Sequence, residues 1–204
     1  APHMKRLAIG ATLNGSELGQ VGRVLKTTRA ITRFFEALLA DSPENGIRHL
    51  FDEVQELVTL PEVTKRLATA IEGDGHITDE ASPELSSIRS HISKTEGEIR
   101  AKMEHYTRGK DAKYLSDPII TIRNDRYVIP VKAENRSRFG GIVHDQSASG
   151  QTLFIEPQAV MALNDRLRQN QVAEKQEEQR ILEELSNLIS PYQDEILQNA
   201  AILG

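Results

Sequence analysis

The sequence predicts a mainly α-helical fold with a small antiparallel β insertion. Apolar residues recur at helical spacing up to about residue 110, a β-rich stretch follows Asp117-Pro118, and helical spacing resumes after Glu156-Pro157. The composition agrees, because 38% hydrophobic residues with only four Tyr, five Phe and no Trp suit paired helices packed with Leu, Ile and Ala. We therefore expect a helical core, a long antiparallel two-helix lever that is coiled-coil-like, and a β clamp at its far tip.

Composition also excludes several classes of protein. The chain has no cysteine, which excludes a disulfide scaffold, a thiolate metal site and a cysteine nucleophile. No apolar run approaches the roughly 20 residues that a membrane span needs, and we expect a cytoplasmic protein. The net charge of −5 disfavours a protein that coats nucleic acid over its whole surface, but it leaves a local basic site open.

Both ends of the chain are interpreted as cuts. Residues 1–4, Ala-Pro-His-Met, are interpreted as a cloning remnant because the Met follows three other residues. At the other end, Ile202-Leu203 keeps helical spacing up to Gly204. We expect a piece of a longer protein.

Residues 5–81 form the predicted helical core region. Ser16 is the expected N-cap of a helix that runs to about Ala40, where the turn cluster 41–46 ends it. A second helix covers residues 50–60, and a proline at position 61 suits the first turn of a third. These three helices could bury one compact core.

The segment 72–79 is expected to be a loop, because it contains two glycines and no helical period. Its side chains Asp74, His76 and Asp79 suggest a divalent-cation site. Three ligands without a fourth partner are more often solvated loop residues, so a metal site is disfavoured.

Residues 82–115 are predicted to form the outgoing lever helix. Ser82 is the expected cap, with Pro83 at the first helical position. The residues spaced seven apart, which indicate a seam against another long helix, are Leu85, Ile92, Ile99 and Tyr106. Residues 157–204 are the predicted returning helix, about 45 residues long, and short connections force it to run antiparallel.

Residues 116–156 are predicted to form a small antiparallel sheet, the β clamp. Two β-rich runs joined by Asn124-Asp125 are typical of a hairpin. The four expected strands are residues 119–123, 126–131, 140–144 and 151–155.

The clamp sequence is locally basic. Residues 123–138 carry a net charge of +3, whereas residues 157–204 carry four cations and eight acids. This separation favours phosphate contact at the clamp, which would position a nucleic acid rather than read its sequence. The alternative is that the cations only discourage edge-to-edge aggregation of an exposed sheet. The five candidate nucleic-acid-binding residues are Arg123, Arg126, Lys132, Arg136 and Arg138.

A hydrolase is a further hypothesis, because His144, Asp145 and Ser147 resemble a nucleophile with its base. Three residues close together on a strand end and a turn rarely converge as a triad, so this hypothesis is disfavoured. Ser147, Ser149 and Gly150 are expected instead to shape the turn. No phosphate-binding loop motif is present, and we expect no catalytic residue in this chain.

One motif carries a family resemblance. Asp117-Pro118, residues 126–132 and the run from Gly141 to Pro157 resemble the bacterial MutS family, and within it the Smr-domain-bearing branch that suppresses recombination and splits collided ribosomes. The match covers nearly the whole chain, more loosely before Gly75. The motif residues, expected to be structural, are Gly141, His144, Asp145, Ser147, Ser149, Gly150, Thr152, Phe154, Glu156 and Pro157.

The resemblance implies a function for the segment. In MutS proteins two clamps of a homodimer close around DNA, and an ATPase domain drives the levers; this implies contact with double-stranded or branched DNA, or with ribosomal RNA. ATP and Mg²⁺ are expected only in the ATPase domain, which this chain lacks along with the Smr nuclease. The alternative is a mechanical protein–protein interaction module. Gly73, Gly75 and the turn 41–46 are expected to absorb the motion.

Overall fold

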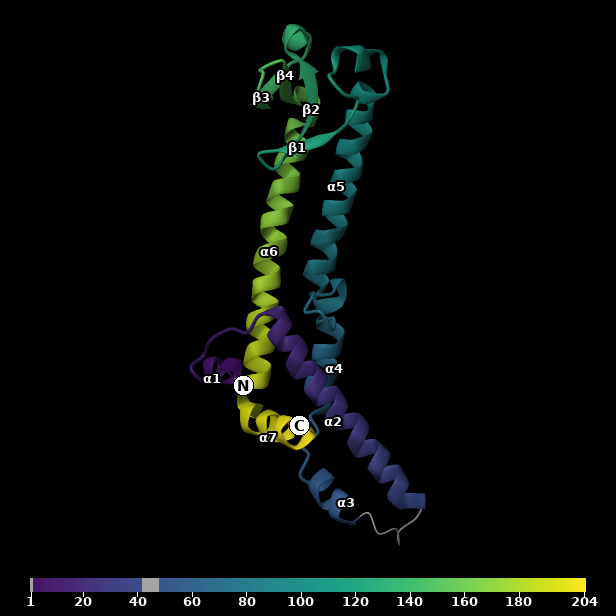
Figure 1. The fold of residues 1–204 in the computed structure, drawn as a ribbon, viewed down its shortest axis with the longest axis vertical. Helices are drawn as coiled ribbons and strands as arrows, with labels where there is room; N and C mark the ends of the chain where they lie inside the picture. Colours follow the sequence, from purple (N-terminus) through teal and green to yellow (C-terminus); the bar gives the residue numbers. More distant parts are fainter. Residues whose placement is uncertain (1, 42–47) are drawn as a thin grey trace. The chain divides into compact units, whose positions relative to one another are not determined.

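The structure, a computed structural model, describes residues 2–41 and 48–204, and its contacts divide the chain into two compact units (Figure 1). Unit 1 comprises Ala1–Ser86 and Gln176–Gly204, and unit 2 comprises Ser87–Lys175. The predicted fold class is confirmed, because the described residues form helices with one four-stranded antiparallel sheet. No helix within these residues is both long and apolar enough to cross a membrane.

Unit 1 is helical. Its complete helices are α1 (Pro2–Ala8), α2 (Gly15–Asp41), α3 (Arg48–Gln55), α4 (Pro61–Ala70) and α7 (Gln193–Leu203), and it also holds the first turn of α5 (Pro83–Thr107) and the last part of α6 (Met161–Ile189). Leu18 and Leu25 of α2, Leu67 of α4, and Ile181 and Leu185 of α6 are at most 1% exposed and pack in one cluster. The three helices predicted in the core region are present, but α3 ends at Gln55, before the predicted stop at Pro61. The predicted turn 41–46 lies almost wholly outside the described residues.

The start of α2 differs from the prediction. Asn14, not Ser16, caps the helix, because its Oδ1 accepts the Glu17 backbone N–H at 2.9 Å. Glu17 returns the contact through Oε1 to the Asn14 N–H at 3.4 Å, which makes a reciprocal capping box. Ser16 lies two residues further along, inside the first turn of α2, so the sequence pattern favoured the wrong capping residue.

Residues 2–4 belong to the fold. They form the first turn of α1, and Met4 is only 2% exposed in the core of unit 1. Excluding them from the predicted fold was therefore wrong.

The returning segment is not one helix. Helix α6 ends at Ile189, a 3₁₀ turn covers Ser190–Tyr192, and α7 begins at Gln193. Pro191 lies in this turn, where its ring cannot continue the α-helical hydrogen bonding. The prediction of about 45 continuous helical residues is wrong for this reason.

The glycine loop of unit 1 is a tight hydrogen-bonded turn. The Glu72 N–H donates to the His76 carbonyl at 2.8 Å, and Ile71 and Ile77 form an antiparallel bridge. Gly75, with φ +92°, lies against the start of α2, where a Cβ on Gly15 would come within 2.0 Å of the Gly75 carbonyl oxygen. The two glycines are needed for this close approach.

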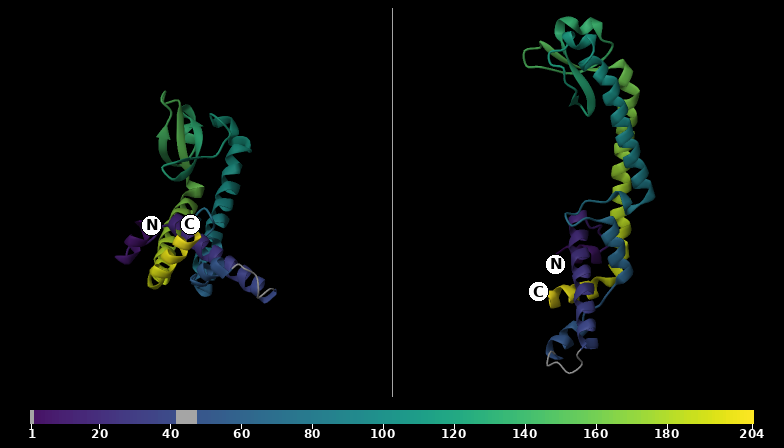
Figure 2. Two further views of the ribbon diagram at one scale, coloured as in Figure 1. Left: turned by 60° about the horizontal axis from the view of Figure 1, so that its bottom comes forward. Right: turned by 90° about the vertical axis from the view of Figure 1, so that its right-hand side faces the viewer.

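In unit 2, α5 and α6 run antiparallel and side by side (Figure 2). Three contacts fix the direction, because residue numbers fall on one helix as they rise on the other. Arg89 pairs with Glu174 at 3.2 Å, Glu98 with Arg166 at 3.9 Å, and Lys102 donates to the Ala159 carbonyl at 3.4 Å. The predicted seam is confirmed within this unit, where Ile99 is fully buried and Ile92 and Tyr106 pack around it.

The sheet of unit 2 follows α5. Its strands are β1 (Thr121–Arg123), β2 (Arg126–Lys132), β3 (Gly141–Gln146) and β4 (Thr152–Pro157), in the order β1-β2-β4-β3, with 3₁₀ turns at Lys110–Tyr114 and Ala133–Arg138. The predicted hairpin is confirmed, since Asn124 and Asp125 have φ of 52° and 59°, as a type I′ turn requires. Ile129, Val131 and Ile155 are fully buried in the cluster that holds the inner residues of α5 and α6.

Candidate nucleic-acid interface

Two of the five predicted cations are paired with acids across the sheet. Arg123 lies 3.4 Å from Asp145 and stacks over the Phe154 ring at 4.2 Å. Arg126 pairs with Asp165, and its Nη1 lies 3.3 Å from Glu156 without hydrogen-bond geometry. These charges are largely neutralised within unit 2.

A third cation is held by backbone carbonyls. Arg136 donates to the Phe139 carbonyl at 2.6 Å and to the Gly141 carbonyl at 3.2 Å, and its side chain is half-buried. The guanidinium fixes the chain between the 3₁₀ turn and β3, so it is committed to the fold.

The remaining two cations, Arg138 and Lys132, lie around Lys113 and Tyr114. Arg138 lies over Tyr114 at 4.3 Å, and Lys113 lies 5.2 Å from the same ring. Lys132 donates to the Lys113 carbonyl at 3.2 Å. We call these four residues (Lys113, Tyr114, Lys132 and Arg138) the Tyr114 cluster. Within the described residues its cations contact carbonyl oxygens and aromatic faces, and no carboxylate pairs with them.

Aromatic packing holds this cluster in place. Phe139, only 6% exposed, contacts Tyr114 at 6.4 Å and Tyr106 of α5 at 5.9 Å between ring centroids. Burial raises the pKa of Tyr106 above its ordinary value of 10, and the Asp111 charge adds to this rise. The Tyr106 phenol therefore stays neutral in this aromatic contact.

The family motif converges on a buried carboxylate. Glu156 is fully buried; its Oε1 lies 2.9 Å from His144 Nε2, and its Oε2 accepts Asn164 Nδ2 at 2.7 Å. Asn164 of α6 also bonds the Tyr127 N–H at 3.2 Å and its carbonyl at 3.3 Å. Gly141 lies against the backbone of Glu156, because a Cβ added at Gly141 would come within 2.0 Å of the Glu156 carbonyl oxygen. The carboxylate thereby joins β2, β3, β4 and α6.

The serines of the motif shape a turn. Ser147 Oγ accepts the Thr152 N–H at 3.1 Å, Ser149 Oγ accepts the Gln151 N–H at 3.4 Å, and Gly150 has φ +72°. The Thr152 hydroxyl reaches Ser116 at 2.7 Å. Local hydroxyl–backbone bonds and a glycine with positive φ are typical of such a turn.

His144 and Ser147 do not form a nucleophile–base pair. The His144 ring nitrogen is engaged by Glu156, Asp145 pairs with Arg123, and Ser147 bonds the turn backbone. The disfavoured hydrolase arrangement is therefore not assembled by these side chains.

The loop residues Asp74, His76 and Asp79 do not gather around one point. Asp74 Oδ1 instead accepts the His76 backbone N–H at 3.0 Å, which closes a local turn. In the part of the chain that the structure describes, no group of three or more acidic, His or Cys side chains is placed to hold a metal ion.

The sequence reasoning missed Lys113, Tyr114 and Asn164. Lys113 and Tyr114 lie in the 3₁₀ turn after α5, which the prediction assigned to the end of a lever helix. The signal available in the sequence was Gly109, because a glycine often follows the end of a helix. In the structure, a Cβ added at this position would come within 2.4 Å of the His105 carbonyl oxygen. Asn164 gave no sequence signal, because one polar residue in a polar helix is not distinctive.

The sequence is similar to those of several curated proteins, of which three are described. Over 203 residues the chain is 90% identical to the Endonuclease MutS2 of Lactiplantibacillus plantarum and 64% identical to that of Levilactobacillus brevis. It is 54% identical over 203 residues to the Endonuclease MutS2 of Enterococcus faecalis. Each match covers 100% of this chain and 26% of the relative, so the chain spans about a quarter of the length of these proteins. No protein-family model matches the chain.

Proposed function

Because the chain belongs to the MutS family, as a segment related to MutS2, we propose that it contacts the phosphate backbone of double-stranded or branched DNA, or of ribosomal RNA, through its β clamp. The observation that carries this proposal is the Tyr114 cluster. It gathers three cations with no carboxylate partner in the described part of the chain. The contact positions the partner and does not read bases.

The rest of the proposed mechanism concerns coupling. The longer protein supplies an ATPase domain with ATP and Mg²⁺, forms a homodimer in the cytoplasm, and drives clamp opening through α5 and α6. The cross-helix contacts in unit 2, from Arg89–Glu174 to Glu98–Arg166, support a helix pair that moves as one piece. Hydrolysis itself is assigned to the rest of the longer protein.

The test is salt-dependent binding. For duplex DNA, three phosphate contacts give a slope of log Kd against log salt of roughly 2.7, since each contributes about 0.9. The variant K113A/K132A/R138A should weaken binding and flatten this slope by that amount. The matched control, K94A/R100A/K175A, removes three exposed cations elsewhere in unit 2 and should change it far less. Equal effects in the two variants would contradict the proposal.

Competition among duplex, four-way junction and purified ribosomes then identifies the partner. An artificially dimerised chain is used, because closure by two clamps adds avidity that a monomer lacks.

A second function, a protein–protein interaction module, is favoured by the sheet edges. Ile122 on β1 is 52% exposed, and Ile142 and Val143 on β3 are 44% and 39% exposed. Both strands lie at edges of the sheet, where apolar side chains and free backbone groups suit pairing with another protein. This function predicts association that survives high salt and is lost in I122D/I142D, while K113A/K132A/R138A retains it.

A further inference from the structure

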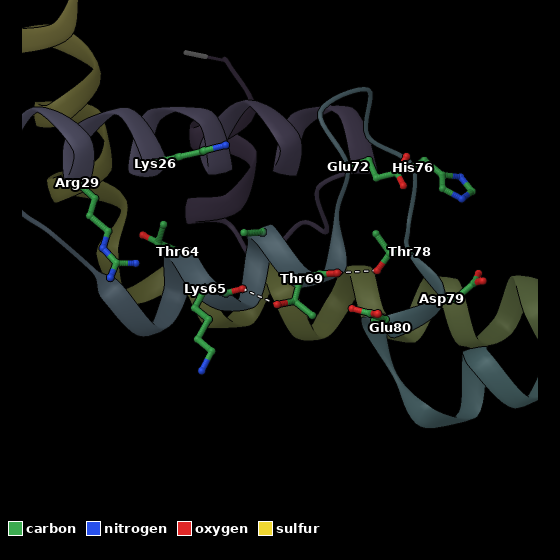
Figure 3. Close-up of a pocket in the computed structure, with 11 residues that line it drawn as sticks. Lys26, Arg29, Thr64, Lys65, Thr69, Glu72, His76, Thr78, Asp79 and Glu80 are labelled. Carbon is green, nitrogen blue, oxygen red and sulfur yellow. Dashed lines mark hydrogen bonds between the residues drawn. The ribbon is translucent and has the colours of Figure 1, made fainter.

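Unit 1 contains a polar groove between α2 and α4 with opposite charges at its two ends. The groove has a volume of about 870 Å³. Figure 3 shows Arg29 of α2 and Lys65 of α4 toward one end, with Lys26 on α2 facing α4, and Glu72, His76, Asp79 and Glu80 toward the other. The cationic end is thus built by two helices rather than by one.

These three cations differ from their neighbours in having no ion pair. Arg66, next to Lys65, pairs with Glu184 at 3.0 Å, and Arg23 donates to the Gly73 carbonyl at 2.6 Å. In the described residues, Lys26, Arg29 and Lys65 have no such partner. Like charges gathered without an ion-pair partner repel one another, and a bound anion reduces that repulsion.

The positive surface continues along α2. Arg33 follows Lys26 by seven residues, so both lie on one face of the helix, about 10 Å apart at 1.5 Å per residue. No single small anion reaches all these charges, whereas a chain of regularly spaced phosphates does. Phe34 is 63% exposed beside this face, which offers a flat ring to an unpaired base.

We propose that the cationic end of the groove and the adjoining face of α2 bind the phosphodiester backbone of a single nucleic-acid strand. The choice of nucleic acid as ligand rests on the proposed function, but the site lies in unit 1 and is separate from the Tyr114 cluster. Glu72 and Asp79 repel phosphates at the far end of the groove, so the bound strand follows α2 from Lys26 toward Arg33.

The experiment measures binding of fluorescent oligothymidine of about 20 nucleotides to the chain with K113A/K132A/R138A already in place. This background removes the Tyr114 cluster, so failure of the proposed function does not affect the result. Adding K26A/R29A/K65A should weaken binding at least tenfold and lower the salt slope by roughly 2, since each single-strand contact contributes about 0.7. Melting curves followed by circular dichroism confirm that each variant folds.

Two controls make the test specific. K5A/R6A removes two cations of α1 that do not line the groove and should bind within about twofold of its parent, because it leaves Lys26, Arg29, Lys65 and Arg33 intact. Phe34→Ala should weaken oligothymidine binding about fivefold without changing the salt slope, because stacking carries no charge.

The proposal would be overturned by no binding in the starting background, by equal losses in the groove variant and its control, or by polyglutamate competing as well as oligothymidine. The last result would identify an acidic protein as the ligand. Tighter binding of duplex than of single strand, with no effect of Phe34→Ala, would equally contradict it.

Discussion

Glu156→Ala should strongly destabilise unit 2, because this fully buried carboxylate joins three strands and a helix. Its oxygens lie 2.7 Å from Asn164 Nδ2, 2.9 Å from His144 Nε2 and 3.3 Å from Arg126 Nη1. The substitution removes all three contacts at once and leaves the Arg126 guanidinium, 21% exposed, without its buried counter-charge.

The expected loss follows from this geometry. Removing one partner of a buried ion pair costs about 3–5 kcal/mol, and the buried Asn164 amide loses its strongest acceptor as well. A unit of about 90 residues has a total stability of roughly 4–13 kcal/mol. At about 4–8 °C per kcal/mol, the melting temperature of unit 2 should fall by at least 12 °C.

Thermal unfolding followed by circular dichroism, with amide exchange to identify unit 2, measures this loss. Glu156→Gln keeps the shape and one acceptor oxygen, so it should lose less than Glu156→Ala. Glu134→Ala removes an exposed carboxylate from the same unit and should stay within about 0.5 kcal/mol of the parent. If Glu156→Ala melts within about 4 °C of the parent, the buried network does not stabilise the sheet and the reasoning is wrong.

Three further predictions concern single positions. Gly141→Ala should lower the free energy of unfolding in urea by at least about 3 kcal/mol, because a Cβ would meet a β4 carbonyl oxygen at 2.0 Å. Gly150→Ala should lower it by about 1 kcal/mol, for its positive φ alone, and equal losses in the two variants would contradict this. Asn14→Ala should cost about 1 kcal/mol through the lost N-cap, and an unchanged melting temperature would refute that role. The hydrogen bond from Arg180 holds the pKa of Glu177 below its ordinary value of 4.5, so its stabilisation of unit 1 is complete above pH 4.5 and is lost as the pH falls through the lowered pKa. Glu177→Gln should remove that part of the acid sensitivity of unit 1. Parallel curves of stability against pH for the variant and the parent would contradict this.

The sequence predicted the helices and strands well where residues that start a helix or form a turn mark their ends. Pro83 after Ser82 marked the start of α5, and Asn124-Asp125 marked the β1–β2 hairpin, because each residue pair favours one backbone conformation strongly. The errors occurred where two local signals competed. Pro191 interrupts an otherwise helical apolar spacing, and the backbone constraint of proline prevailed over the periodicity.

The candidate site was harder to predict, because the sequence gives charges but not their partners. The cations Arg123 and Arg126 look equivalent to Arg138 in the sequence, yet strand pairing places them beside Asp145 and Glu156. A basic window therefore measures how many cations are present, whereas phosphate contact depends on how many lack an internal counter-charge. The same distinction applies in unit 1, where Arg66 pairs with Glu184 and Arg23 donates to the Gly73 carbonyl. The neighbouring cations of the α2–α4 groove have no such partner in the described residues. Both interfaces can accordingly be tested by removing unpaired cations while the paired ones stay in place.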